Sequence, residues 1–432
     1  MRRYLYSLVL YLATPVLLAY LLWRSRREPA YRRGVAERFG LQRPVAPRDA
    51  VWVHAASVGE VQAVSSLIRA CQARWPDRPV VISTLTPAGH AHVTRLFGDT
   101  VQPVLLPFDQ PHAMRRFLAT LRPRVAVIME MELWPNLFAA VRRRGIPLLL
   151  INARLSARSA RRYRRLGRLV RDMLATPATI AAQTQADADR LIALGAPAAR
   201  VQLTGNLKFD VAVPAPRGEV EGLPRAGAGR RPVWIAASTR DGEEPLVLKA
   251  FDRVRAEHAD ALLVLVPRHP DRFETVAALC RAQGLTLARR SRGEDPAAAN
   301  VLLGDTMGEL SVLYSAADVA FVGGSLVPLG GQNVLEPAAM GLPVIVGPHT
   351  FNFSRVVDQL LECGGALRVT DAAALGTTVS RLLGDADERR DRGHRGQALI
   401  AANRGAGERV LTLLAAFLTS PRLRDDGAVT PV

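Results

Sequence analysis

The sequence predicts an α/β protein with two domains, each built on a parallel β-sheet that helices cover on both faces. Short apolar runs alternate with helical stretches in two segments, about residues 50–210 and 233–369. These runs are continuously apolar, which is typical of strands buried on both faces of a parallel sheet. A length of 432 residues fits two such domains, and 49% hydrophobic residues suffice for two cores.

The first element is an uncharged apolar segment from Tyr4 to Trp23, long enough to cross a bilayer as a helix. Arginines follow it at once, so the positive-inside rule leaves the rest of the chain in the cytoplasm. The flank WRSRR lacks the small residues of a cleavage site, which argues against a signal peptide. Because Pro15 weakens a straight span, a helix that lies on the membrane surface is the alternative. We therefore expect residues 1–24 to form a membrane anchor helix.

The first domain is expected to span residues 25–210. Its predicted strands are, in order, VWVHAA, VVISTLT, VQPVLLPF, VAVIME, PLLLIN, TIAAQT and VQLTGN. Between them, stretches such as VQAVSSLIRACQARW carry apolar residues at helical spacing. This alternation predicts a Rossmann-like domain.

A second Rossmann-like domain is expected at residues 233–418. Residues 211–232 separate the two domains and are rich in Pro and Gly without periodicity, which is typical of a linker. The predicted strands of the second domain are PVWIAAS, ALLVLVP, LTLARR, NVLLGD, VAFVGG and PVIVGP. Residues 419–432 are expected to form a tail, and we expect a cleft between the two domains.

The charge balance favours an anionic partner. Lys and Arg number 57 against 39 Asp and Glu, a formal net charge of +18. Nucleic acid, an acidic membrane surface or a phosphorylated substrate would fit, and arginine bias in the source genome is the other explanation. The three cysteines are far apart and form no CxxC pair, so neither a zinc site nor a disulfide framework is indicated.

Ligands of open parallel sheets bind outside the carboxyl ends of the strands, so those ends are the candidate sites. In the first domain they carry residues 57–60 (SVGE), 130–136 (EMELWPN) and 205–210 (GNLKFD). Glu60 and Glu130 are carboxylates at the ends of different strands, and such an acid can serve as general base. Helix capping or a surface salt bridge is the ordinary alternative.

In the second domain, Gly323-Gly324-Ser325 ends a strand and residues 333–336 (NVLE) open a helix. Backbone amides at the N-terminus of this helix, helped by its dipole, could hold a phosphate without a metal, and the Gly-rich turn before it would form part of the same anion site. Glu336 could accept hydrogen bonds from ribose hydroxyls, and Arg268 with His269 could contact a phosphate or a base. The GxGxxG and GxxxxGK[ST] motifs are absent, and no DxD stands at a strand end. We expect no metal and no cofactor.

Together these residues resemble the 3-deoxy-D-manno-octulosonic acid (Kdo) transferases, which are membrane-associated inverting glycosyltransferases of the GT-B fold. The matching segments reach from the N-terminal apolar helix to about residue 354 and are HAASVGE, IMEMELWPN, NARLSARS, GNLKFD, VPRHPDRF, GDTMGEL, GGQNVLEP and GPHTFNF. ELWPN with NARLSARS and GNLKFD is highly specific, whereas many GT-B enzymes share GGxNxLEP in outline. Gln332 stands where the family more often has histidine.

The resemblance implies transfer of Kdo from CMP-Kdo to the lipid A precursor, lipid IVA, at the cytoplasmic face of the inner membrane. It implies Glu60 as the proton acceptor, and Glu130 and Lys208 as transition-state stabilisers. On this interpretation Ser57 and Gly59 let the chain turn sharply, so that Glu60 faces the donor. The residues implied to bind CMP are Arg268, His269, Met307, Gly308, Glu309, Asn333, Val334, Leu335 and Glu336.

An arginine-rich run between Arg154 and Arg171 is the best candidate for contacts with lipid phosphates or with anionic lipids of the membrane. A solvated helical face would have the same composition. Two alternatives for the function remain: a GT-B relative with another nucleotide sugar, such as a UDP-sugar transferase or epimerase, and a membrane-anchored nucleic-acid binder. The last lacks a helix-turn-helix, an RNP motif and an aromatic platform, so we expect no nucleic acid as partner.

Overall fold

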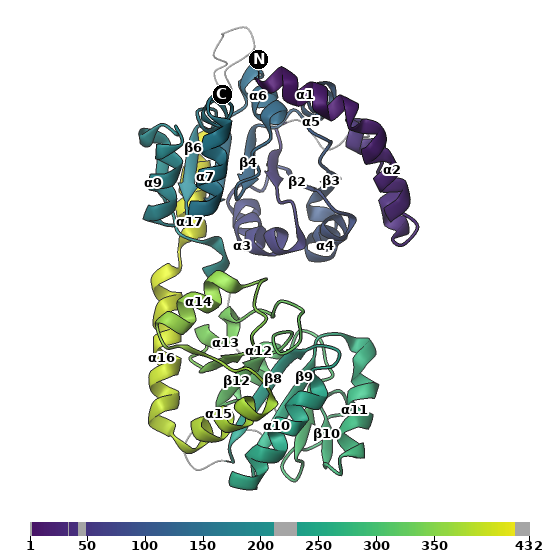
Figure 1. The fold of residues 1–432 in the computed structure, drawn as a ribbon, viewed down its shortest axis with the longest axis vertical. Helices are drawn as coiled ribbons and strands as arrows, with labels where there is room; N and C mark the ends of the chain where they lie inside the picture. Colours follow the sequence, from purple (N-terminus) through teal and green to yellow (C-terminus); the bar gives the residue numbers. More distant parts are fainter. Residues whose placement is uncertain (1, 33, 42–48, 211–230, 420–432) are drawn as a thin grey trace. The chain divides into compact units, whose positions relative to one another are not determined.

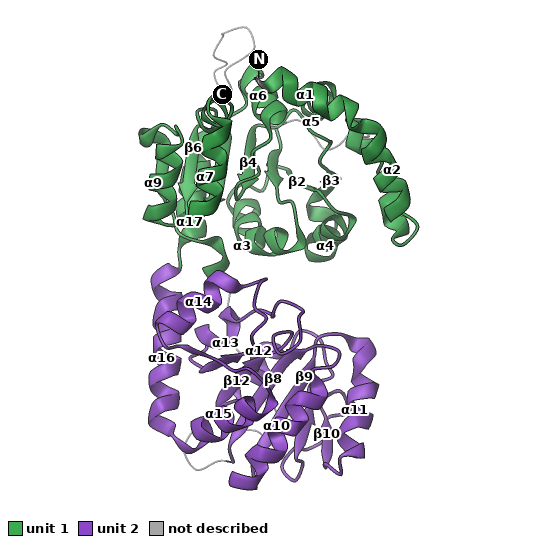
Figure 2. Ribbon diagram, viewed as in Figure 1, with its two compact units in different colours: residues 1–210, 404–432 green, residues 211–403 purple. Residues whose placement is uncertain are grey.

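The structure is a computed structural model that describes residues 2–32, 34–41, 49–210 and 231–419. It confirms an α/β protein with two parallel sheets, each in its own compact unit (Figures 1 and 2). Residues 1–210 and 404–432 form unit 1, and residues 211–403 form unit 2. Apart from residues 231, 232 and 419, the predicted linker and tail lie outside the described residues.

The sheet of unit 1 has seven parallel strands in the order β3-β2-β1-β4-β5-β6-β7. All the strands predicted for this domain are present: β1 (Val51–His54), β2 (Val80–Thr84), β3 (Gln102–Leu105), β4 (Val125–Met129), β5 (Leu148–Ala153), β6 (Thr179–Ala182) and β7 (Val201–Leu203). Successive side chains of β1 serve opposite faces, since Trp52 packs into one core and Val51 with Val53 into the other. The strand order reverses between β1 and β4, which makes their carboxyl ends the switch point where ligands bind in such sheets.

Helices cover both faces of this sheet. Their bounds are α1 (Arg2–Leu12), α2 (Thr14–Arg24), α3 (Val58–Arg74), α4 (Pro87–Phe97), α5 (Pro111–Leu121), α6 (Pro135–Arg143), α7 (Ala157–Leu166), α8 (Arg168–Leu174), α9 (Gln185–Ala193) and α17 (Ala406–Leu418). Residues of α3, α4 and α17 share one apolar core, and residues of α5, α6, α8 and α9 share the other.

Unit 2 repeats the architecture with the strand order β10-β11-β9-β8-β12-β13-β14. Its strands are β8 (Val233–Thr239), β9 (Leu262–Pro267), β10 (Leu287–Arg289), β11 (Val301–Leu303), β12 (Val319–Val322), β13 (Val344–Val346) and β14 (Ala366–Arg368). The edge strand β14 was not predicted, because three residues ending in arginine carry too little apolar signal. The helices are α10 (Glu244–Glu257), α11 (Phe273–Ala282), α12 (Leu310–Ser315), α13 (Leu335–Ala339), α14 (Ser354–Glu362), α15 (Ala372–Gly384) and α16 (Ala386–Asn403). The switch point of this sheet lies between β8 and β12.

Helix α17 corrects the predicted end of the second domain at residue 418, because it packs on unit 1. Val410 and Leu414 belong to the core that also holds Val51 and Leu67. Arg409 Nε donates to the carbonyl of Thr204 at 2.7 Å. The apolar spacing of this helix shows that it needs a core, but it does not say which one.

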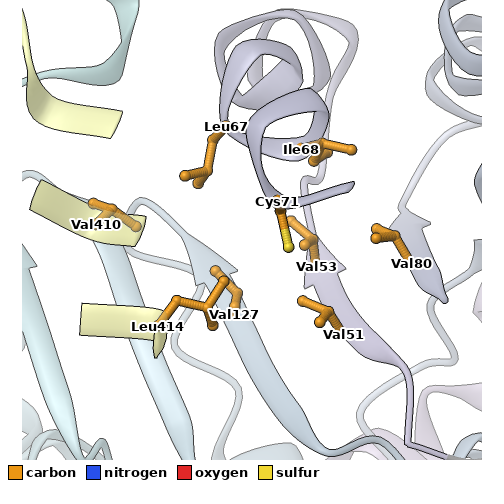
Figure 3. Close-up of a pocket in the computed structure, with 9 residues that line it drawn as sticks. All are labelled: Val51, Val53, Leu67, Ile68, Cys71, Val80, Val127, Val410 and Leu414. Carbon is orange, nitrogen blue, oxygen red and sulfur yellow. The ribbon is translucent and has the colours of Figure 1, made fainter. Parts of the chain in front are cut away.

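A small cavity of about 10 Å³ remains where α17 meets the sheet (Figure 3). Its lining is apolar apart from the thiol of Cys71, with side chains from β1, β2, β4, α3 and α17. A cavity of this size without polar partners does not hold water, so it is a packing defect and not a ligand site.

The N-terminal apolar segment forms two helices rather than the single one predicted. Helices α1 and α2 are bent by 49° at the break between Leu12 and Thr14. Pro15 stands in the first turn of α2, where its ring and missing N–H interrupt a continuous helix. In the described part of the chain no single helix is long and apolar enough to cross a membrane, although the two helices of this bent pair together have the length and composition to do so.

We expect Leu414→Ala to lower the free energy of unfolding by about 2–4 kcal/mol, because it enlarges a cavity in a core that cannot close over it. Leu414 is 2% exposed and lines the existing cavity. Urea unfolding followed by circular dichroism measures the change, with the exposed Thr412→Ala on the same helix as control. Equal stability of the two variants would contradict the packing of α17 on unit 1.

Candidate active site

Glu60 lies in the first turn of α3, directly after β1. Ser57 is the N-cap in an extended conformation, and its side chain accepts from the amide of Glu60 at 3.3 Å. The Glu60 carboxylate reaches back and accepts from the Ala56 amide at 2.8 Å and from the Ser57 hydroxyl at 3.1 Å. This reciprocal pair is a variant of the capping box. The turn is made at Ser57, since a side chain at Gly59 would meet only ordinary contacts and Gly59 is not needed for it.

The capping role of Glu60 does not exclude chemistry at the same carboxylate. Burial raises the pKa of Glu60 to about 7, helped by the charges of Glu130 and Glu132 and opposed by the hydrogen bonds from Ala56 and Ser57. A carboxylate with a pKa near neutrality is well matched to accept a proton at physiological pH. Geometry and electrostatics therefore both allow Glu60 to act as a general base.

Glu130 follows β4, the strand next to β1, so the two predicted carboxylates stand at the switch point of the sheet. Its backbone has φ = 55°, in the left-handed region that non-glycine residues rarely adopt. Such a conformation costs about 1–3 kcal/mol and is concentrated at functional sites. Two residues on, Glu132 accepts a hydrogen bond from Trp134 Nε1 at 2.9 Å, and burial raises its pKa.

Lys208 completes this group from the segment after β7. Its Nζ lies 3.9 Å from Glu130 Oε1, and both side chains are about one-third exposed. Asn152, buried at the end of β5, holds this segment because its Oδ1 accepts from the Leu207 amide at 3.0 Å. The structure thus brings together the three side chains that the sequence proposed for catalysis, and Glu132 and Asn152 join them.

The arginine-rich run forms α7 and α8 beside this group. All its arginines are exposed: Arg154, Arg158, Arg161, Arg162, Arg164, Arg165, Arg168 and Arg171. Burial, with a contribution from the Glu132 carboxylate, raises the pKa of Tyr163, so this helix passes close to Glu132. A strongly basic surface therefore adjoins the carboxylates of unit 1.

In unit 2 the predicted pair Arg268 and His269 is exposed at the carboxyl end of β9. His269 Nε2 lies 2.8 Å from Nη1 of Arg240, which follows the neighbouring strand β8. Partial desolvation and the charges of Arg240 and Arg268 lower the pKa of His269. Two guanidinium groups beside this imidazole form a place that attracts an anion. No role was expected for Arg240 from the sequence, although its position at a strand end signalled it.

Asn333 and Glu336 are also brought close to Arg268. Asn333 Nδ2 donates to Glu336 Oε1 at 2.9 Å, while burial raises the pKa of Glu336 and the charge of Arg268 opposes this. Val334 and Leu335 are buried, so their side chains serve the core. The helix they begin, α13, has only five residues, which makes its dipole a weaker anion site than the sequence suggested.

The turn Met307-Gly308-Glu309 has its own contacts. Met307 is 62% exposed and Gly308 has φ = 86°. The Glu309 carboxylate accepts from the Thr306 hydroxyl at 2.7 Å and from Arg290 Nε at 3.1 Å, which lowers its pKa. The contacts described for Glu309 thus join it to Arg290 rather than to Arg268.

The glycine-rich turn after β12 was expected to be part of a phosphate site, and this expectation is wrong. The amides of the turn already donate hydrogen bonds to a carboxylate of the chain itself. Glu243 is fully buried and accepts from the amides of Gly324 at 2.6 Å, Ser325 at 3.0 Å, Leu326 at 2.9 Å and Arg240 at 3.2 Å. A side chain at Gly323 would lie 2.8 Å from Glu243 Oε2, so glycine is required there. The turn is a structural support, and the anion-attracting groups beside it are Arg240 and Arg268.

Comparisons with known proteins identify the family of the chain. The sequence model of a family described as "3-Deoxy-D-manno-octulosonic-acid transferase (kdotransferase)" matches residues 33–211. The chain is 40% identical to the 3-deoxy-D-manno-octulosonic acid transferase of Haemophilus influenzae over 97% of this chain and 99% of that protein. It is 42% identical to the 3-deoxy-D-manno-octulosonic acid transferase of Bordetella pertussis over 97% of this chain and 100% of that protein.

Among solved structures, a putative UDP-N-acetylglucosamine 2-epimerase from Listeria monocytogenes has a similar fold. The TM-score is 0.53 at 15% identity, and the match covers 89% of this chain and 100% of that chain. This likeness concerns the fold alone: two parallel α/β sheets that resemble GT-B glycosyltransferases.

We expect Glu243→Gln to lower the free energy of unfolding by about 1–3 kcal/mol, because an amide N–H₂ would face backbone N–H groups that need an acceptor. Urea unfolding measures the change. Glu257→Gln, an exposed substitution in the last turn of α10, of which Glu243 is the N-cap residue, is the control. A stability equal to that of the control would show that the turn does not depend on Glu243.

Proposed function

The chain belongs to the family of 3-deoxy-D-manno-octulosonic acid (Kdo) transferases, and we propose that it moves Kdo from CMP-Kdo to lipid IVA with inversion at the anomeric carbon. As a member of this family it is a glycosyltransferase, and Kdo transfer places it in lipopolysaccharide biosynthesis.

The observation that carries the proposal is the Glu60 carboxylate. It is half-buried at the switch point of unit 1, with a pKa raised by burial to about 7. An inverting transfer in one displacement needs a single base, which takes the proton of the attacking hydroxyl. Glu60 supplies that base, and a second nucleophile is not required.

The reaction then proceeds in one step. A hydroxyl of the acceptor gives its proton to a Glu60 oxygen while its own oxygen bonds to the anomeric carbon of Kdo. The bond from that carbon to the phosphate of CMP breaks on the opposite face, and its electron pair leaves with CMP. Glu130 and Lys208 stabilise the charges that develop, since a carboxylate favours a cationic sugar and an ammonium favours a leaving phosphate.

For the donor, the groups available in unit 2 support CMP binding. Arg268 and Arg240 provide positive charge for the phosphate beside His269. Asn333 and Glu336 provide polar atoms at the carboxyl end of the sheet for the ribose, with the Met307–Glu309 turn as a further contact. Because the amides of the glycine-rich turn are used by Glu243, the arginines take the role first expected of that turn.

We further propose that unit 1 works at the cytoplasmic face of the inner membrane. Helix α1 presents an apolar side to the outside, with Leu5 62%, Leu8 55% and Leu12 71% exposed. Such a surface is costly in water and favourable in the acyl region of a bilayer. The exposed arginines of α7 and α8 suit the phosphates of lipid IVA and of anionic lipids.

We expect Glu60→Gln to lower the transfer rate by roughly 10²- to 10⁴-fold while CMP affinity stays unchanged, because the base acts on the acceptor. The measurement is product formation from CMP-Kdo and lipid IVA, with calorimetry for CMP. The wild type should gain activity as pH rises through about 7, since Glu60 must lose its proton to act.

Ser57→Ala is the matched control, because it weakens the helix cap and leaves the base. It should lower stability by about 1 kcal/mol and change the rate much less than Glu60→Gln does. If Glu60→Gln kept activity within about tenfold of wild type, the base role would be excluded. A wild type that transfers no Kdo from CMP-Kdo would sink the proposed donor.

We expect the triple variant Leu5→Ser, Leu8→Ser and Leu12→Ser to bind phosphatidylglycerol-containing vesicles at least about tenfold more weakly, because three leucines no longer enter the acyl region. Vesicle sedimentation of the full chain measures this. Leu203→Ser, 54% exposed on the edge strand β7, is the control. Equal binding of both variants would contradict attachment through α1, and any remaining binding should fall with salt.

A further inference from the structure

The segment Glu132 to Asn136 (ELWPN) is one of the highly specific motifs of the sequence, yet the proposed chemistry uses none of it. In the structure it connects β4 to α6. Trp134 is the N-cap of α6 without a side-chain cap, and its indole instead donates to Glu132. The free amides at the start of α6 therefore need an acceptor from another part of the chain.

Asp109 supplies that acceptor from the segment before α5. Its Oδ2 accepts from the Asn136 amide at 2.9 Å and its Oδ1 from the Leu137 amide at 2.7 Å. In return, Asn136 Nδ2 donates to the Asp109 carbonyl at 2.7 Å. Asp109 is 2% exposed, and burial raises its pKa to about 7 against the opposing hydrogen bonds. This pair fixes where the Glu130–Asn136 turn ends.

Helix α1 binds to the same pair. Tyr6 is hydrogen-bonded to the Asp109 carboxylate, and Ser7 Oγ donates to Asn136 Oδ1 at 3.1 Å. A neighbouring contact joins Gln110 Nε2 to Thr14 Oγ1 at 2.7 Å, where the two N-terminal helices meet. Polar side chains thus dock the helix, while Leu5, Leu8 and Leu12 are exposed, the reverse of an ordinary surface helix.

These contacts make a continuous path from α1 to the acidic turn. Asn136 is six residues from Glu130 on a short connection whose two ends are held by β4 and by Asp109. The charges of Glu130 and Glu132 contribute to the pKa of Glu60, so their positions bear on the base itself. Without the hydroxyls of Tyr6 and Ser7, the Asp109 carboxylate and the Asn136 amide oxygen each lose a hydrogen-bond donor, which weakens their hold on the turn.

We propose that Asp109 and Asn136 are positioning residues through which docking of α1 sets the geometry of the Glu130–Glu132 turn. The N-terminal helix is then a working part of the acceptor-side site as well as an attachment to membrane. The activity measurements below rest on the proposed function, whereas the exchange measurement does not.

The test is the double variant Tyr6→Phe with Ser7→Ala, which removes two hydroxyls and keeps the size of both side chains nearly unchanged. Amide hydrogen exchange in the full chain should become faster at Asn136 and Leu137, not only in α1. The kcat should fall roughly 10-fold with an unchanged KM for CMP-Kdo, since displaced groups cost rate rather than donor affinity. The acid limb of the pH profile should move to lower pH, because a loosened turn leaves Glu60 better hydrated and further from Glu130 and Glu132.

Tyr4→Phe is the matched control, because Tyr4 is 71% exposed on the same helix. It should leave exchange, kcat and the pH profile as in the wild type. Unchanged exchange at Asn136 and Leu137 in the double variant would overturn the proposal, as would faster exchange with unchanged kcat and pH profile. A wild type without Kdo transfer would refute the proposed function, and the exchange result would still decide whether α1 holds the turn.

Discussion

Buried carboxylates that accept hydrogen bonds from backbone amides hold the strand-end loops in both units. Asp109 holds the start of α6, Asp187 accepts from the Leu155 amide at 2.9 Å, and Glu243 gathers the turn after β12. Loop amides at the end of a buried sheet need acceptors, and a carboxylate offers two oxygens that only accept. Although the chain has a net charge of +18, arginine could not serve at these positions, because a guanidinium only donates hydrogen bonds and the amides need an acceptor.

Glu243 and Glu60 differ in the number of backbone amides that their carboxylates accept from. Glu243 receives four amides and is fully buried, so both its oxygens are occupied. The Glu60 carboxylate accepts from one amide, that of Ala56, and from the hydroxyl of the exposed Ser57. The neighbouring carboxylates Glu130 and Glu132 favour its protonated form. The same local motif therefore holds Glu60 in place and leaves its carboxylate able to exchange a proton.

The turn from Glu130 to Asn136 is the point where the features of unit 1 meet. Lys208 approaches Glu130 from the segment after β7, Tyr163 approaches Glu132 from the basic helix α7, and Ser7 reaches Asn136 from α1. The left-handed conformation of Glu130 is tolerated there because contacts on several sides determine the turn. The acidic turn thus lies close to the basic helix α7 and is bonded to helix α1, whose Leu5, Leu8 and Leu12 are exposed.

The sequence by itself determined the two parallel sheets and the strand ends that carry Glu60, Glu130 and Arg268, because apolar runs and strand-end motifs are local patterns. It left open what α17 and α1 pack against, since an apolar spacing shows that a helix needs a partner but not which one. It also assigned the amides after β12 to a phosphate. In the structure these amides donate to the Glu243 carboxylate, which lies 82 residues before Ser325 in the sequence. Only the tertiary structure decided these points, because such hydrogen bonds join side chains and amides that no local pattern relates.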